Sequence, residues 1–192
     1  LQEYSPIEKK LIGPVFNIFK GTELGKTEGP HLYKHNGMYY LMTAEGGTGL
    51  GHAVTVARSE SITGPYEVDP ENPILTSKPD PTLPLQKCGH ASLVETQTGE
   101  WYIAHLCARP LPSRGRCILG RETAIQKVVW TDDGWLRLEG GGRFPKTCVP
   151  APKIANGDAE KTVTPKEKTI DHFDSPVLDI QYQTLRVPLG ED

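Results

Sequence analysis

The sequence lacks the features of membrane-spanning and nucleic-acid-binding proteins. None of its apolar runs approaches the roughly 20 residues that a helix needs to cross a bilayer. Its 21 lysines and arginines are outnumbered by 24 aspartates and glutamates, and the formal net charge is −3. Such a chain has no excess of positive charge with which to bind a phosphate backbone. We therefore expect neither a membrane nor a nucleic acid as a partner.

Cysteine is also scarce, and its spacing excludes the common metal and redox motifs. The four cysteines, Cys88, Cys107, Cys117 and Cys148, are irregularly spaced and form no C-x-x-C motif. A zinc site or a thioredoxin-like motif is therefore not expected. Free buried thiols are the preferred interpretation, and disulfides stay open. The compartment, cytoplasmic or secreted, is left undecided.

Glycine and proline, in contrast, are abundant, with 20 and 17 residues. The pairs Asn36-Gly37, Thr98-Gly99 and Asp133-Gly134 separate short apolar runs, which is typical of β-hairpins. No long amphipathic helix is evident. The pattern predicts a short helical turn over residues 6–12 and strands over residues 18–20, 31–34, 38–43, 52–59, 91–95, 100–107, 123–130 and 135–139.

Two of these hairpins resemble each other. Leu32 and Gly37 of the first recur 61 and 62 residues later as Leu93 and Gly99, each glycine followed by an aromatic pattern. A repeated strand unit of this kind indicates the blades of a β-propeller. We therefore predict an all-β fold that is part of a propeller. Two units and a partial third do not close a ring, so we expect blades to be missing on the N-terminal side.

The pattern changes after this region. Residues 1–149 are predicted to be the C-terminal part of the propeller domain. Residues 150–169 are polar and rich in Pro, Lys and Glu, which favours a linker. Residues 170–192 alternate again and predict the opening of a second β domain, a stub too short to fold by itself.

Glu28 is the first candidate for chemistry, because it lies at the mouth of a strand and just before Gly29-Pro30. Hydrolysis of a glycosidic bond needs one carboxyl group to protonate the leaving oxygen and a second to activate water or attack the sugar. A carboxyl at a stiff strand-end corner suits the first role. The alternative is a solvated turn residue, since glutamate is mostly exposed.

Other candidates are less specific. The glycine-rich loop over residues 45–52 lacks the helix and the lysine of a P-loop, so a tight turn is favoured over a phosphate site. His90 is interpreted as a hydrogen-bonded structural residue or as a channel ligand. Arg121 either pairs with Glu122 or Asp133 at the surface, or binds sugar hydroxyls. Glu28, His90 and Arg121 each precede a predicted strand, and equivalent strand starts converge at one end of a propeller.

Taken together, six segments resemble the family 43 glycoside hydrolases, and within that family the β-xylosidases. They are residues 26–33 (KTEGPHLY), 39–48 (YYLMTAEGGT), 52–59 (HAVTVARS), 61–66 (SITGPY), 89–94 (GHASLV) and 120–124 (GRETA). In addition, residues 173–176 (FDSP) resemble the entry to that family's C-terminal β-sandwich.

The resemblance implies a five-bladed β-propeller followed by a β-sandwich. The implied reaction inverts the anomeric centre and releases xylose from the non-reducing end of xylo-oligosaccharides, with Glu28 as general acid. His90 matches a channel histidine that is sometimes associated with a calcium ion or a water molecule. Arg121 matches a substrate-contacting arginine, and Thr48 lies in a loop that approaches the sugar. No cofactor is otherwise expected, and the full-length protein is a candidate homo-oligomer.

The chain departs from the family at two aspartates. The family's general base and a second aspartate that tunes the acid both precede the general acid, whereas no aspartate precedes Asp69 here. The chain therefore resembles the later blades of a longer enzyme. Two alternatives remain: an α-L-arabinofuranosidase or dual-specificity enzyme, and a non-catalytic propeller that binds sugar or protein.

We predict that the 192-residue chain alone does not hydrolyse xylobiose at the rate of an intact enzyme, because the attacking water lacks its base. The measurement is the release of nitrophenol from a nitrophenyl xyloside by the purified chain. Measurable turnover would contradict the prediction.

Overall fold

The computed structural model describes residues 1–112, 115–153 and 172–176, and within them every regular element is a β-strand. No helix long and apolar enough to cross a membrane occurs in this described part. The chain divides into two compact units, Leu1–Ala155 and Asn156–Asp192. Most of the expected linker and sandwich stub lies outside the described residues, so the predicted domain division stays a prediction.

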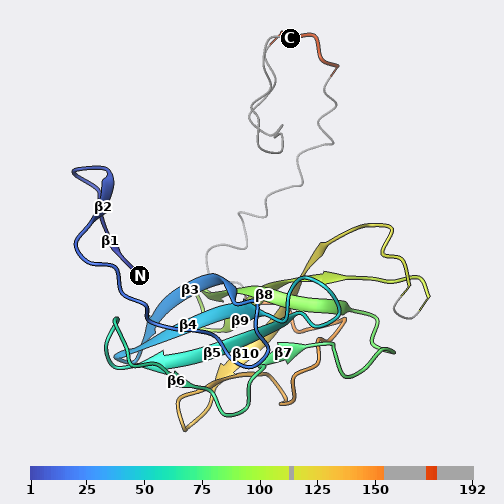
Figure 1. Cartoon of the computed structure of the whole chain (residues 1–192). Coiled ribbons are helices and arrows are strands. Elements are labelled where there is room, and N and C mark those ends of the chain that lie inside the picture. Colours follow the sequence, from blue (N-terminus) through green and yellow to red (C-terminus); the bar gives the residue numbers. More distant parts are fainter. Residues whose placement is uncertain (113–114, 154–171, 177–192) are drawn as a thin grey trace. The chain divides into compact units, whose positions relative to one another are not determined.

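The first sheet is an antiparallel meander (Figure 1). Its main strands are β3 (Glu28–His35), β4 (Met38–Glu45), β5 (Ala53–Ser59) and β6 (Glu67–Val68), and β7 (Leu75–Thr76) also pairs with β5. The β3–β4 hairpin turns at Asn36 and Gly37, whose φ angles of 47° and 83° match the predicted Asn-Gly turn. The expected hairpin is confirmed.

The second sheet repeats this arrangement. It contains β8 (Gln86–Glu95), β9 (Trp101–Ala108), β10 (Glu122–Trp130) and β11 (Leu136–Leu138), in the spatial order of the chain. The β3–β4 and β8–β9 hairpins are the repeated units detected in the sequence. Four-stranded antiparallel meanders of this kind are propeller blades, so the predicted all-β class is confirmed.

Two N-terminal predictions are wrong. Residues 6–12 form no helical turn: β1 (Glu3–Ser5) and β2 (Lys10–Ile12) pair as a hairpin, and the turn between them closes at Lys9 with a φ of 52°. Residues 18–20 form no strand. Their apolar side chains face a hollow instead of a neighbouring strand, and a strand needs a hydrogen-bonded partner.

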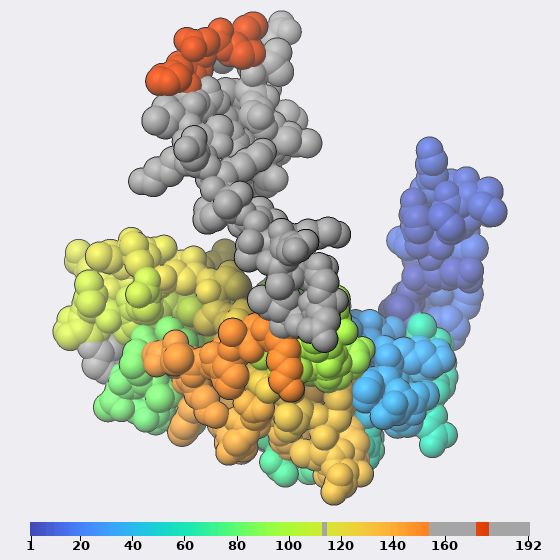
Figure 2. Space-filling view, turned by 180° about the vertical axis from the view of Figure 1, so that it is seen from behind, coloured from blue at the N-terminus to red at the C-terminus, as the bar shows by residue number. Residues whose placement is uncertain are grey.

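The two blades pack directly against each other (Figure 2). Their shared core includes Met42 and Val54 from the first blade and Leu93 and Ile103 from the second. Trp135 belongs to this core, and Trp101 and Trp130 pack against it, so these rings serve as packing residues.

Hydrogen bonds also cross between the blades. The Leu93 amide of β8 donates to the Tyr33 hydroxyl of β3 at 2.8 Å, and the Tyr40 hydroxyl of β4 donates to the Gly134 carbonyl at 2.6 Å. Arg58 donates to the Asp133 carbonyl at 2.7 Å. The first bond joins the inner strands β3 and β8, and the other two join β4 and β5 to the turn between β10 and β11. The second blade is therefore held against the first along its width.

All four cysteines are free. Cys88 and Cys107 are buried, as expected, whereas Cys117 is half-buried and Cys148 is exposed. Burial raises the pKa of the Cys88 thiol to about 12, so this side chain acts as a small apolar core residue.

A buried ion pair joins the outer parts of the blades. Asp69, just after β6, is fully buried, and Arg137 of β11 donates to its two carboxylate oxygens at 2.5 and 3.0 Å. Glu71 lies 3.2 Å from the Arg137 Nε atom. Removal of one partner leaves the other charge buried and poorly compensated.

We predict that Asp69→Ala and Arg137→Ala each lower the free energy of unfolding by about 3 kcal/mol. The double variant is expected to lose less than the sum, since neither charge is then left alone. Urea denaturation of the three variants measures this. The control is Lys10→Ala, which removes the exposed Lys10–Glu8 ion pair and is expected to change stability little. Additive losses in the double variant would contradict the coupling.

Candidate active site

Glu28 opens β3 at a β-bulge. Glu28 lies opposite Ala44, but the next regular pair is His31 with Met42, so β3 carries one extra residue. The extra residue falls at Gly29-Pro30, where Gly29 has a φ of 54° that suits glycine. The predicted Gly-Pro corner is thus a bulge that re-aims the Glu28 side chain.

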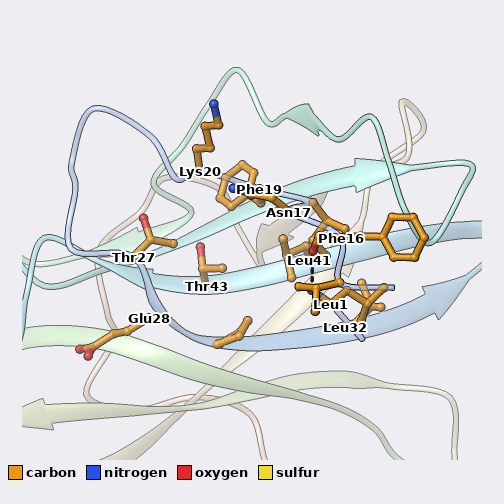
Figure 3. Close-up of a pocket in the computed structure, with 13 residues that line it drawn as sticks. Leu1, Phe16, Asn17, Phe19, Lys20, Thr27, Glu28, Leu32, Leu41 and Thr43 are labelled. Atoms are coloured by element: carbon orange, nitrogen blue, oxygen red, sulfur yellow. Dashed lines mark hydrogen bonds between the residues drawn. The ribbon is translucent and has the colours of Figure 1, made fainter. Parts of the chain in front are cut away.

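The Glu28 carboxylate is exposed and has no hydrogen-bond or ion-pair partner within the described part of the chain. It lies at the end of a 670 Å³ hollow lined mostly by apolar side chains. In Figure 3 the Glu28 side chain extends away from Leu1, Phe16 and Leu32 of that hollow. The apolar lining does not suit a hydroxyl-rich ligand, so the chemically interesting side of Glu28 is the one facing the second blade.

The inner strand of the second blade is also bulged, and more strongly. Gln86 lies opposite Ala108, whereas Ala91 lies opposite His105, so β8 contains two extra residues between these pairs. Lys87 and His90 adopt left-handed φ angles of 56° and 52°, which are costly for residues with a side chain. The strand therefore begins at Gln86, earlier than predicted, and His90 lies inside it.

The bulges of β3 and β8 lie against each other. A Cβ atom on Gly29 would lie 2.5 Å from the His90 Nε2 atom, so the imidazole rests on the backbone next to Glu28. The His31 ring stands edge-on to His90, with ring centroids 6.4 Å apart. The structure thus brings together Glu28 and His90, two of the residues predicted from the sequence.

Arg121 lies at the same end of the blades. It directly precedes β10, and its charge, like those of Glu28 and His90, acts on the nearby His52 imidazole. The surface pairing considered for Arg121 is not found in the described part: Glu122 instead binds Arg109 at 2.6 Å. However, β10 is the third strand of its blade, so Arg121 does not come from an equivalent strand start, as the sequence argument assumed.

Thr48 is not brought into this group. It is exposed in the loop between β4 and β5, and no contact joins it to Glu28, His90 or Arg121. The predicted tight loop is confirmed, because a Cβ atom on Gly46 would lie 2.0 Å from the Gly51 carbonyl oxygen.

Comparisons with known proteins establish the family and the fold. The model of the family "Glycosyl hydrolases family 43" matches residues 1–136. The chain belongs to glycosyl hydrolase family 43. A Beta-xylosidase of Bacillus subtilis is 52% identical over 200 residues, which cover 100% of this chain and 36% of the relative. A Xylosidase/arabinosidase 43B of Humicola insolens is 57% identical and covers 98% and 34%.

A solved family 43 structure extends the match to the fold. The xylan beta-1,4-xylosidase from Bacillus halodurans C-125 is 58% identical, with a TM-score of 0.85, covering 98% of this chain and 35% of that one. The family 43 chain therefore has the propeller blades predicted from its sequence. It spans about a third of the length of the relatives that it matches.

Sequence reasoning missed Glu45 as a site-supporting residue of this family 43 chain. Glu45 ends β4 and is fully buried, and its carboxylate accepts hydrogen bonds from the Thr22 amide at 3.0 Å and the Thr27 hydroxyl at 3.2 Å, and from the Thr22 hydroxyl. It thereby holds the loop that leads into Glu28. The signal available in the sequence was the position of this glutamate, just after a predicted strand and directly before two glycines.

Two buried histidines were also missed. His52 and His105 are each 1% exposed, and each Nδ1 is bonded to a backbone carbonyl, of Lys87 at 3.0 Å and Leu106 at 2.9 Å. Their Nε2 atoms have no partner in the described part of the chain. Burial lowers the pKa of both imidazoles, so they are neutral at neutral pH.

The described residues do not form a calcium site by themselves. No group of three or more His, Cys, Asp or Glu side chains is arranged to hold a metal within them. The His90 imidazole lies against the Gly29 backbone and near the His31 ring. Calcium, in contrast, takes six to eight oxygen ligands. The calcium ion expected near His90 therefore stays a prediction.

We predict that replacing His105 by Asn costs less stability at low pH than at high pH. Burial is the main cause of the lowered His105 pKa, so the unfolded chain binds more protons than the folded one as pH falls below about 6.5, the ordinary pKa of histidine. The native protein therefore gains stability as pH rises towards 6.5 and keeps it above. The Asn variant lacks this dependence.

The measurement is the difference in Tm between parent and variant from pH 8 to pH 5.5. We expect the difference to shrink as pH falls. His172→Asn, at an exposed histidine, is the matched control. A difference that is constant with pH for His105→Asn would contradict the prediction.

Proposed function

We propose that the full-length protein containing this chain is an inverting β-xylosidase, and that Glu28 is its general acid. The observation that carries the proposal is the position of Glu28 at a bulge, next to the His90 imidazole and at the same end as Arg121. Family membership and the names of the matched relatives support the reaction class.

In the proposed step this chain supplies the proton donor. The Glu28 carboxyl transfers its proton to the glycosidic oxygen as the bond from that oxygen to the anomeric carbon breaks. A water molecule attacks the opposite face of the sugar and loses its proton to a carboxylate that another part of the protein supplies. The Glu28 carboxylate is unpaired in the described part, so no ion pair has to be broken before it acts.

The neighbouring residues receive supporting roles in this proposal. The planar guanidinium of Arg121 is suited to binding sugar hydroxyls or orienting a carboxylate. His90 lies against the Gly29 backbone beside Glu28, and its imidazole is able to hydrogen-bond a sugar hydroxyl or a water molecule. Thr48 is retained as a sugar contact from the β4–β5 loop, supported by its place in the matched segment alone.

The substrate is proposed to be a xylo-oligosaccharide with a β-1,4 bond at its non-reducing end. The Bacillus halodurans structure carries that specificity in its name. The Humicola insolens relative is named for both xylosidase and arabinosidase, which supports dual specificity as the second candidate. Parallel assays with nitrophenyl xyloside and nitrophenyl arabinofuranoside separate the two. Homo-oligomerisation of the full-length protein remains part of the proposal.

We predict that Glu28→Gln in the full-length protein lowers kcat for xylobiose by about 10²–10⁴-fold. Dinitrophenyl xyloside should be affected far less, because dinitrophenolate leaves without being protonated. Binding of xylose, measured by calorimetry, should be retained. The matched control is Glu23→Gln, which removes an exposed carboxylate from the same loop and should leave both rates near those of the parent.

Two results would count against the acid role. Equal losses for both substrates would mean that Glu28 does not protonate the leaving group. Unchanged hydrolysis of xylobiose would remove Glu28 from the reaction altogether. If the full-length protein binds xylose but hydrolyses neither substrate, the non-catalytic propeller is the better description.

A further inference from the structure

We propose that His52 is a positioning residue: it holds the β8 bulge in the shape that places His90 against Gly29, beside Glu28. The position of His90 beside Glu28 matters for turnover only if the proposed function is right, so the catalytic part of this inference rests on that proposal. The positioning itself is a statement about geometry and is tested separately.

His52 is itself held firmly. It lies just before β5, in the first blade, and is 1% exposed. Its amide donates to the Gly49 carbonyl at 3.2 Å, and its carbonyl accepts a hydrogen bond from the Thr76 hydroxyl at 2.9 Å. The His52 backbone is therefore hydrogen-bonded through both its amide and its carbonyl. This fixes the position of the side chain against which the β8 backbone packs.

The side chain of His52 reaches across to the second blade at the bulge. Its Nδ1 atom lies 3.0 Å from the Lys87 carbonyl oxygen, so this nitrogen carries the proton that is donated. A Cβ atom on Gly89 would lie 2.4 Å from the Cγ and Cδ2 atoms of the His52 ring. The ring thus lies flush on the backbone between Lys87 and His90.

The hydrogen bond and the ring contact made by His52 act on two features of the β8 bulge, its interrupted pairing with β9 and its left-handed backbone angles. The extra residues in β8 interrupt its pairing with β9 between Gln86 and Gly89, and the His52 imidazole supplies the Lys87 carbonyl with a donor. Lys87 and His90, on either side, hold left-handed φ angles of 56° and 52°. Such angles persist where surrounding contacts impose them, and the first blade supplies the His52 ring against Gly89, besides the Gly29 backbone against His90.

The consequence reaches the candidate site directly. His90 is the next residue after Gly89, and its imidazole lies where a Gly29 Cβ atom would be. A relaxation of the bulge would rotate this imidazole away from Glu28. Because a displacement of about 1 Å at a reacting group can cost about 100-fold in rate, His52 is expected to matter for turnover without touching the sugar.

The test uses His52 variants of the full-length protein that separate the donor from the ring. His52→Phe keeps a ring but lacks the donor, whereas His52→Asn offers an amide donor at the place of Nδ1. We expect His52→Phe to lower kcat for xylobiose by about 10–100-fold and His52→Asn to recover most of the loss. Circular dichroism confirms that each variant is folded.

A second set of variants tests the ring contact by steric relief. Gly89→Ala places a methyl group into the His52 ring and should disturb His90 as His52→Phe does. In the His52→Ala background the ring is gone, so the added Gly89→Ala change should cost little more. This comparison keeps the test decisive if His52→Phe does not fold.

A readout without catalysis separates this inference from the proposed function. The imidazole carbon and proton shifts of His90, assigned with His90→Gln, are followed by NMR on histidine-labelled protein. Shifts that move in His52→Phe and return in His52→Asn support the positioning role, even if Glu28→Gln shows that Glu28 is not the acid. His90 shifts that stay unchanged in His52→Phe and in Gly89→Ala overturn it, whatever the activities are.

Discussion

The His90 imidazole and the backbone of Gly29 approach so closely that no side chain can stand at position 29. This contact joins the inner strands of two blades at the end where Glu28 lies. It requires a bulge in β3, where glycine accepts the left-handed angle easily, and a larger bulge in β8, where Lys87 and His90 accept it at a cost. The geometry of the candidate site therefore depends on two irregularities that coincide across the blade interface.

Such a contact is stable only if the blades keep a fixed separation. Tyr33 bonds β3 to the middle of β8, and the Asp69–Arg137 pair joins the blades at their outer side. The Tyr33 hydrogen bond and the Asp69–Arg137 ion pair connect two blades that also share a continuous apolar core. A rotation of one blade would have to break a buried ion pair or open that core, so interactions far from Glu28 contribute to the position of the His90 ring.

The sequence predicted those features of the fold that residues adjacent in the chain determine. Asn36-Gly37 fixes a hairpin turn through the backbone angles that these two residues accept, and the repeat between the regions of Leu32 and Leu93 indicated blades. The failures have a different origin. The hairpin over residues 3–12 depends on cross-strand bonds that its turn residues did not reveal. The bulge at His90 is contacted by His52, 38 positions earlier in the chain, and local patterns do not report such contacts.

The same distinction explains which candidate site residues could be proposed from the sequence. Glu28 could be proposed from the sequence because an acid before Gly-Pro at a strand start is a local signal, and Arg121 because it precedes a strand. Glu45 and His52 were not found, because their roles come from burial against other segments: Glu45 against the loop at Thr22, and His52 against the backbone of β8. Both are buried polar groups that satisfy backbone donors or acceptors near a candidate site residue. In this fold the candidate site residues therefore lie on short corners that are encoded locally, and buried polar side chains that only the tertiary structure reveals hold those corners in position.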